Sequence, residues 1–76
     1  MTEVEWMKIF GQNLAEIMKE QGYTQKDLAE ATNLSTSAIS NYVRGTQIPT
    51  LRAIINMTYE LNQDLNFFID FGDRID

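Results

Sequence analysis

A regular series of signals that start and stop helices divides this sequence. Hydroxyl residues able to cap a helix N-terminus precede the apolar segments, at Thr2, Thr24, Ser35 and Thr50. Residues that tolerate a left-handed backbone follow three of these segments, at Gly22, Asn33 and Gly45. Strand signals are weak, because no run of alternating β-branched residues is flanked by hairpin turns. The pattern predicts an all-α fold.

The first helix is expected from about Glu3 to Gln21, and a capping box between Thr2 and Glu5 predicts its start. Its apolar residues recur at i, i+4, i+7 and i+8, on one helical face: Phe10, Leu14, Ile17 and Met18. Gly11 lies inside this segment and costs about 1 kcal/mol relative to Ala, so the sequence allows a break or kink there.

Four further helices complete the predicted compact five-helix bundle. The second runs from the Thr24 cap to about Thr32–Asn33, and the third from the Ser35 cap to Val43 or Arg44. The fourth begins at the Thr50 cap, and a short fifth follows Asp64, using Leu65, Phe68 and Ile69. By default we assign these apolar residues to the core: Leu28, Ala29, Leu34, Ile39, Tyr42, Leu51, Ile54 and Leu61.

Length and composition restrict the function. The 76 residues suffice for one small domain over positions 1–76, and the chain contains no Cys and no His. Disulfides, thiol chemistry, the usual zinc sites and His-based catalysis are therefore excluded, and the glycines form no phosphate-cradling loop. We expect no enzyme activity, no cofactor, no metal and no small-molecule ligand. Without a signal peptide or a bilayer-length apolar run, a cytoplasmic location is expected and no membrane partner.

The third predicted helix has two distinct faces. Ile39, Tyr42 and Val43 form an apolar stripe at i, i+3 and i+4. A separate polar stripe carries hydroxyls, an amide and a guanidinium but no acid: Thr36, Ser37, Ser40, Asn41 and Arg44. Such a face offers hydrogen-bond donors and acceptors without repelling phosphate, as reading base edges in a major groove requires. An ordinary solvated helix face is the alternative interpretation of this stripe.

The stretch from Thr24 to Gly45 (TQKDLAEATNLSTSAISNYVRG) resembles the helix-turn-helix of the lambda-repressor-like, XRE family. Further similar motifs lie where the family's other helices begin and end, and they extend the resemblance over residues 9–70: Phe10-Gly11-x-x-Leu14, Gly22-Tyr23-Thr24, Pro49-Thr50-Leu51 and Leu61-Asn62-Gln63-Asp64-Leu65. The resemblance implies a compact five-helix domain with the helix-turn-helix proper at about 24–45.

The same resemblance implies roles for individual residues. Four residues of the third helix would face the bases: Thr36, Ser37, Ser40 and Asn41. Five would contact backbone phosphates: Gln25, Lys26, Arg44, Thr46 and Gln47. Asn41 is the best single candidate for base readout because its amide can pair with adenine through two hydrogen bonds, and Arg44 could instead reach a guanine.

Taken over the whole chain, the net charge of −5 argues against DNA binding, which depends largely on Lys and Arg. Divided along the chain, the charge is −2 over residues 1–23, +1 over 24–52 and −4 over 53–76. The only basic third contains the polar stripe. Because exposed charges are screened beyond about 8 Å at physiological salt, the acidic ends are expected to oppose DNA binding only modestly.

These observations predict a sequence-specific regulator of the repressor type, which binds double-stranded DNA as a homodimer on a palindromic operator. The third helix would lie in the major groove. An alternative function is a protein-interaction module, antitoxin-like or antirepressor-like, that uses the acidic surface and the aromatic C-terminal segment.

Overall fold

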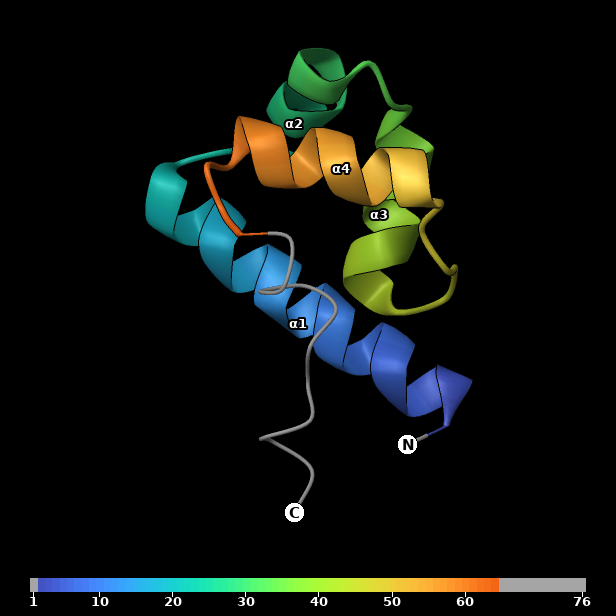
Figure 1. Ribbon diagram of the computed structural model, residues 1–76. Helices are drawn as coiled ribbons and strands as arrows, with labels where there is room; N and C mark the ends of the chain where they lie inside the picture. Colours follow the sequence, from blue (N-terminus) through green and yellow to red (C-terminus); the bar gives the residue numbers. More distant parts are fainter. Residues whose placement is uncertain (1, 65–76) are drawn as a thin grey trace.

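A computed structural model of the chain describes residues 2–64. It contains α1 (Glu3–Gln21), α2 (Gln25–Thr32), α3 (Thr36–Arg44) and α4 (Leu51–Glu60), and no strand within the described range. Helix α3 packs against α1 and α2, and α4 packs against α2 (Figure 1). The all-α prediction is confirmed, whereas the expected fifth helix lies outside the described residues.

The capping residues define the helix starts as the sequence predicts. The hydroxyls of Thr2, Thr24, Ser35 and Thr50 each accept the backbone N–H three positions later, so one otherwise unpartnered amide is satisfied at every start. Left-handed residues end the first three helices: Gly22, Asn33 and Gly45. Local chemistry therefore sets the lengths of these helices.

Helix α1 runs continuously through Gly11, so the break that the sequence allowed there does not occur. Gly11 instead provides room for α3. A Cβ added at this position would lie 2.5 Å from the carbonyl oxygen of Val43 and 2.6 Å from that of Tyr42. The backbones of α1 and α3 thus approach each other more closely than any side chain would allow.

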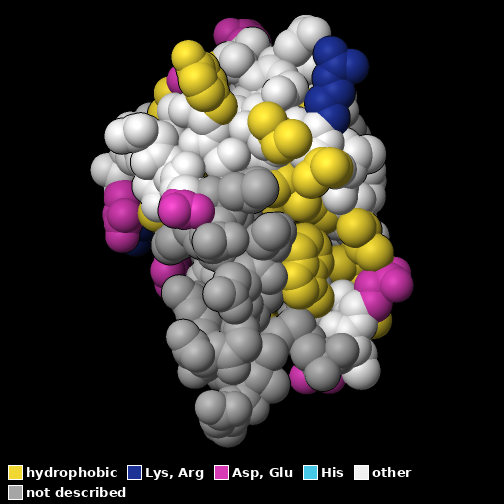
Figure 2. Space-filling model, viewed as in Figure 1, with side chains coloured by type: hydrophobic (Ala, Val, Ile, Leu, Met, Phe, Trp, Pro, Cys, Tyr) yellow, Lys and Arg dark blue, Asp and Glu magenta, His cyan; other side chains and the backbone are white. Residues whose placement is uncertain are grey.

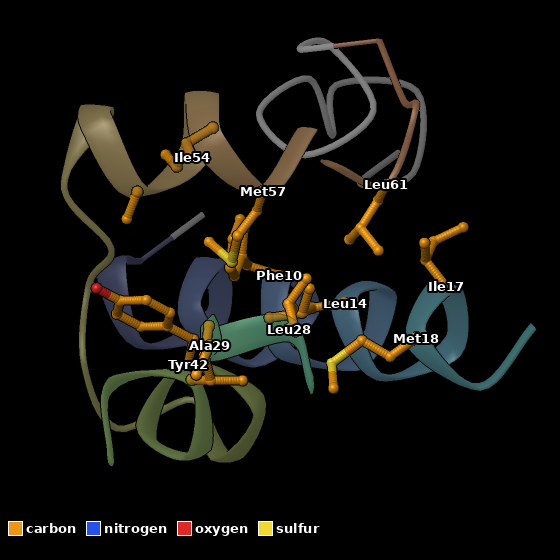
Figure 3. Packing of buried hydrophobic residues seen from close by; sticks show 12 residues of the cluster. Phe10, Leu14, Ile17, Met18, Leu28, Ala29, Tyr42, Ile54, Met57 and Leu61 are labelled. Atoms are coloured by element: carbon orange, nitrogen blue, oxygen red, sulfur yellow. The ribbon is translucent and has the colours of Figure 1, made fainter. Parts of the chain in front are cut away.

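Side chains from all four helices meet in one core (Figure 3). Six large side chains are almost completely buried: Phe10 and Leu14 from α1, Leu28 from α2, Ile39 from α3, Met57 from α4, and Leu61 directly after α4. Trp6 is half-buried and stacks on Phe10 with ring centroids 5.2 Å apart. This core fixes the orientation of α3 relative to the rest of the domain.

The prediction that Leu51 belongs to the core is wrong, because its side chain is 66% exposed. Helix α4 is apolar on two sides, and Leu51 lies on the outer side with Ile55 and Tyr59. Hydrophobic side chains are visible along this outer face of α4 (Figure 2). Leu34, also expected in the core, is only partly buried and packs against the core from outside.

Polar contacts between helices hold the turns in place. The Tyr23 hydroxyl donates a hydrogen bond to Glu60, and Gln21 Nε2 donates to the Leu61 carbonyl at 2.7 Å. The turn between α1 and α2 is therefore fixed to the end of α4.

Among the helices described here, none is both long and apolar enough to cross a membrane.

Candidate nucleic-acid interface

The turn between α2 and α3 sets the position of α3. Asn33 adopts a left-handed conformation with φ 59° and ψ 35°. The next amide, that of Leu34, donates to the Ala29 carbonyl at 3.0 Å, and Ser35 then caps α3. Asn56 of α4 donates to the carbonyl of Thr32 at 3.3 Å. Backbone and side-chain bonds thus hold the two helices at a fixed angle, as a helix-turn-helix requires.

The two faces that the sequence predicts for α3 are present. On the inner face Ile39 and Tyr42 are buried, and burial raises the pKa of the Tyr42 phenol. On the outer face Thr36 and Ser37 are exposed. The remaining outer residues of the stripe, Ser40, Asn41 and Arg44, are likewise accessible at the surface, and α3 contains no acidic residue.

Three of the predicted site residues form one hydrogen-bonded group at the end of α3, which we name the Asn41 cluster: Asn41, Arg44 and Gln47. The Arg44 guanidinium donates to Asn41 Oδ1, and Asn41 Nδ2 donates to Gln47 Oε1 at 3.0 Å. Thr46 reinforces the group, since its backbone N–H and its hydroxyl both donate to the Asn41 carbonyl, at 3.0 and 3.3 Å. The loop after α3 is thereby attached to the polar stripe.

The Asn41 cluster leaves the Asn41 amide able to bind a base. An amide oxygen has two lone pairs and an amide nitrogen has two hydrogens, and the cluster uses one of each. One lone pair and one hydrogen remain, which is the number that pairing with N6 and N7 of adenine uses. The bonds to Arg44 and Gln47 also fix which end of the amide is oxygen. The cluster thus limits the rotation of this side chain before any ligand binds.

A second group of predicted residues lies at the start of α2. Gln25 and Lys26 occupy its first two positions, and Lys26 is exposed. The first amides of a helix lack intrahelical partners and carry the positive end of the helix dipole. The Thr24 hydroxyl accepts the amide of Asp27, the third of these. The start of α2 therefore has the geometry of an anion-binding site, although the Asp27 carboxylate partly offsets its charge.

Two lysines of α1 that the sequence analysis did not assign lie beside these groups. Lys19 lines a surface depression together with Thr24 and Gln25 at the start of α2. Lys8 borders the end of α3, where its Cα lies 3.1 Å from the position that a Cβ on Gly45 would occupy. Both lysines are exposed.

The spacing of these lysines in the sequence could have indicated that they lie on the same side of α1. They are the only basic residues of α1 and are eleven residues apart, which places them within about 20° of each other around the helix axis. The basic residues of this acidic segment are thus not scattered. They lie along the edge of α1 that borders α2 and α3.

The residues that the structure describes offer no site for a metal ion. Within positions 2–64, no three Asp, Glu, His or Cys side chains come together in a way that could coordinate one. The surface formed by α3 and the adjoining parts of α1 and α2 presents amides and hydroxyls together with four exposed cations: Lys8, Lys19, Lys26 and Arg44.

Comparisons with known proteins agree with this geometry. The helix-turn-helix family model HTH_3 matches residues 14–66. The controller protein C.AhdI of a restriction-modification system from Aeromonas hydrophila is similar in structure, with TM-score 0.79 and 25% identity over 83% of this chain and 96% of that one. No match is found among curated proteins.

Two further solved structures share the fold. SinR, in the SinR–SinI protein complex, is one of them, with TM-score 0.78 and 25% identity over 88% of this chain and 67% of the matched chain. An HTH_3-family transcriptional regulator from Vibrio cholerae has TM-score 0.84 at 19% identity, over 97% of this chain and 42% of that one. The family match covers more than half of the sequence and includes both helices of the turn motif. The chain therefore belongs to the HTH_3 helix-turn-helix family of DNA-binding transcriptional regulators.

Proposed function

We propose that this protein binds specific double-stranded DNA sequences with α3 in the major groove and acts as a repressor. The observation that carries the proposal is the Asn41 cluster, which holds an amide in a fixed orientation on an acid-free polar helix face. Asn41 would read adenine through Oδ1 and Nδ2. Thr36, Ser37 and Ser40 would contribute less discriminating contacts from the same face, because hydroxyls accept from or donate to several bases.

Phosphate contacts would surround the base-reading face. Gln25 and Lys26 would hold a phosphate at the start of α2, where the helix dipole favours an anion. Arg44, Thr46 and Gln47 would hold another at the end of α3. Lys8 and Lys19 extend this basic rim along α1, where their position beside Gly45 and Gln25 supports the assignment. These local cations would allow the surface to bind DNA although the net charge of the chain is −5.

We further propose that two copies bind a palindromic operator. One domain has few cations and would bind weakly, whereas two domains double the number of phosphates that are neutralised. Recognition helices of such dimers enter major grooves about 34–36 Å apart, one helical turn of DNA. Occupying a promoter in this way would exclude other proteins, which is the basis for proposing repression.

Selection of bound sequences from random duplex DNA, at two salt concentrations, tests this function. The expected result is enrichment of a palindromic motif with half-sites one helical turn apart, together with weaker binding at higher salt. A library without enrichment at either concentration would contradict the proposal. A motif enriched without symmetry would retain the DNA-binding function and contradict the homodimer.

One comparison favours a second function, that of a protein-interaction module. The structure of SinR, which is 25% identical to this chain, was solved as a complex with the protein SinI. The acidic surface of the present chain would suit a basic partner. Failure to bind DNA or heparin at low salt, with stable capture of one basic protein, would support this second function over the first.

A further inference from the structure

The loop between α3 and α4 carries Gln47, and it is anchored on both sides of this residue. Gly45 and Pro49 are buried, whereas Gln47 between them is exposed. Gly45 lies against the backbone of α1, since a Cβ added to it would be 3.1 Å from the Lys8 Cα. Pro49 has a φ angle that its ring fixes, and Thr50 after it caps α4. The position of Gln47 therefore depends on α1 and α4 as well as on α3.

Asn41 is held by two side chains that have different supports. Arg44 belongs to α3 itself, three residues after Asn41, so these two residues move as parts of one helix. Gln47 is six residues away on the anchored loop, and its Oε1 accepts a hydrogen bond from Asn41 Nδ2 at 3.0 Å. The bond to Gln47 thus connects the Asn41 side chain to a part of the domain outside α3.

The two ends of the Gln47 amide differ in chemistry, and the bond to Asn41 uses only one of them. Its oxygen accepts from Asn41, whereas its nitrogen has two hydrogens that this bond leaves free to donate. Because Gln47 is exposed, that nitrogen is accessible to a DNA phosphate. One side chain can therefore orient Asn41 through its oxygen and bind phosphate through its nitrogen.

From this arrangement we infer that Gln47 is a positioning residue, whose oxygen fixes the Asn41 amide and thereby increases its discrimination between bases. The inference rests on the proposed function, in which Asn41 reads adenine. Adenine offers a donor at N6 and an acceptor at N7, and it pairs with an amide in one orientation. An amide that is already held in place loses less side-chain freedom when it binds.

The same restraint raises the cost of a wrong base. Guanine offers acceptors at both N7 and O6, so the oxygen of a fixed amide would face an acceptor and repel it. A freely rotating amide would avoid this repulsion by turning away and keeping one hydrogen bond. Specificity increases when the wrong partner meets such a repulsive contact. Holding Asn41 should therefore favour adenine and disfavour guanine at the same position.

Three substitutions of Gln47 separate its two ends. Gln47→Glu keeps an oxygen acceptor and loses the donor, Gln47→Lys keeps a donor and loses the acceptor, and Gln47→Ala loses both. The quantity measured is the ratio of dissociation constants for two duplexes. One is the selected operator, and the other carries guanine in place of the adenine at which Asn41→Ala loses its preference.

Gln47→Ala and Gln47→Lys should each lower this ratio by roughly three- to tenfold, the range expected when one side chain is no longer held in place. Gln47→Glu should keep the ratio of the wild type. Affinity for the operator should follow the opposite order, because the carboxylate repels phosphate and the ammonium attracts it. A purely electrostatic role of Gln47 would change binding to both duplexes alike and leave the ratio unchanged in all three variants.

Two controls show that the effect passes through Asn41. Ile48→Ala truncates the neighbouring loop residue, which is 45% exposed and lies outside the Asn41 cluster, and it should leave the ratio unchanged. In the Asn41→Ala background, Gln47→Ala should lower the ratio no further, because the residue that it positions is gone. Circular dichroism and urea unfolding check that every variant is folded.

A measurement on the free protein tests the positioning without DNA. Nuclear magnetic resonance relaxation of the Asn41 side-chain amide should show restricted motion in the wild type and in Gln47→Glu. The same amide should be more mobile in Gln47→Ala and Gln47→Lys. If it is restricted in the wild type and released in Gln47→Ala, but the wild type binds no duplex, the positioning is supported and the DNA-binding function is contradicted.

Three results would overturn the inference. The first is an Asn41 amide that is equally mobile in the wild type and in Gln47→Ala. The second is a Gln47→Lys variant that keeps the wild-type ratio, or a Gln47→Glu variant that loses as much of it as Gln47→Ala does. The third is a selected operator with no adenine at which Asn41→Ala loses preference, which would leave the DNA-binding function intact.

Discussion

The Arg44 guanidinium donates a hydrogen bond to Oδ1 of Asn41, so a cation of the candidate interface is bonded directly to its best base-reading amide. The two residues are three positions apart on α3 and share its exposed edge. Although they are bonded to each other, the two residues would have different roles, which mutation can distinguish. Asn41 would carry sequence discrimination, and Arg44 would carry charge while also orienting the amide.

Asn41→Ala should therefore relax sequence preference. Loss of a bidentate base contact costs about 1–3 kcal/mol on the preferred sequence and little on others. Arg44→Ala should weaken binding to all sequences and lower the slope of log K against log salt by about 0.9. Fluorescence anisotropy on the selected operator and on a scrambled duplex, at several salt concentrations, measures both effects. Equal behaviour of the two variants would contradict the division of roles.

Lys8→Gln and Lys19→Gln should each reduce the salt slope by up to about 0.9 without changing sequence preference. The reason is their position beside the end of α3 and the start of α2. Asn62→Asp is the control, since it changes the net charge by the same amount at an exposed position beyond α4. If this control lowers the slope as much as the lysine variants do, the effect comes from overall charge and not from contacts along α1.

Gly11→Ala should destabilise the domain by about 1–3 kcal/mol, although Ala is the better helix former. The new Cβ would meet the carbonyl oxygens of Val43 and Tyr42 at 2.5 and 2.6 Å, so α3 would have to move away from α1. Urea unfolding measures the loss. Gly22→Ala is the comparison, because there the left-handed φ of 75° is strained but nothing lies within 4 Å of the added Cβ. A Gly11→Ala variant as stable as the wild type would contradict the close crossing.

Stability should fall at high pH, and Tyr23 should contribute to the fall. Its hydrogen bond to Glu60, followed by burial, raises the pKa of the Tyr23 hydroxyl in the folded chain. A raised folded pKa means that the contribution is complete below the unfolded value of about 10 and is lost as the pH rises through the folded pKa. Tyr23→Phe should therefore be less stable than the wild type at pH 7, with the difference shrinking above pH 10.

The sequence predicts the helices well because their ends depend on local chemistry. Thr2, Thr24, Ser35 and Thr50 cap the four described helices by bonds to residues three positions away, which any reader of the sequence can locate. The same locality explains why the two faces of α3 were predictable. Whether a helix has one apolar face and one polar face follows from the helical period alone.

What the sequence could not predict depends on contacts between distant segments. The role of Gly11 depends on α3 crossing over it, and helix propensities carry no information about such a crossing. The misplaced Leu51 has a related cause, since α4 is apolar on two sides and only its packing decides which side is buried. The bond between Asn41 and Gln47 joins a helix to a loop six residues on, and it requires the left-handed turn at Gly45 to be placed in space.

The most direct test of base reading by Asn41 uses the selected operator with 7-deazaadenine replacing adenine at one position at a time. This change removes the N7 acceptor and leaves Watson–Crick pairing intact. At one position in each half-site, the change should weaken binding of the wild-type protein and have no effect on the Asn41→Ala variant. If every 7-deazaadenine substitution weakens both proteins equally, Asn41 does not read adenine, and the assignment of the α3 face is contradicted.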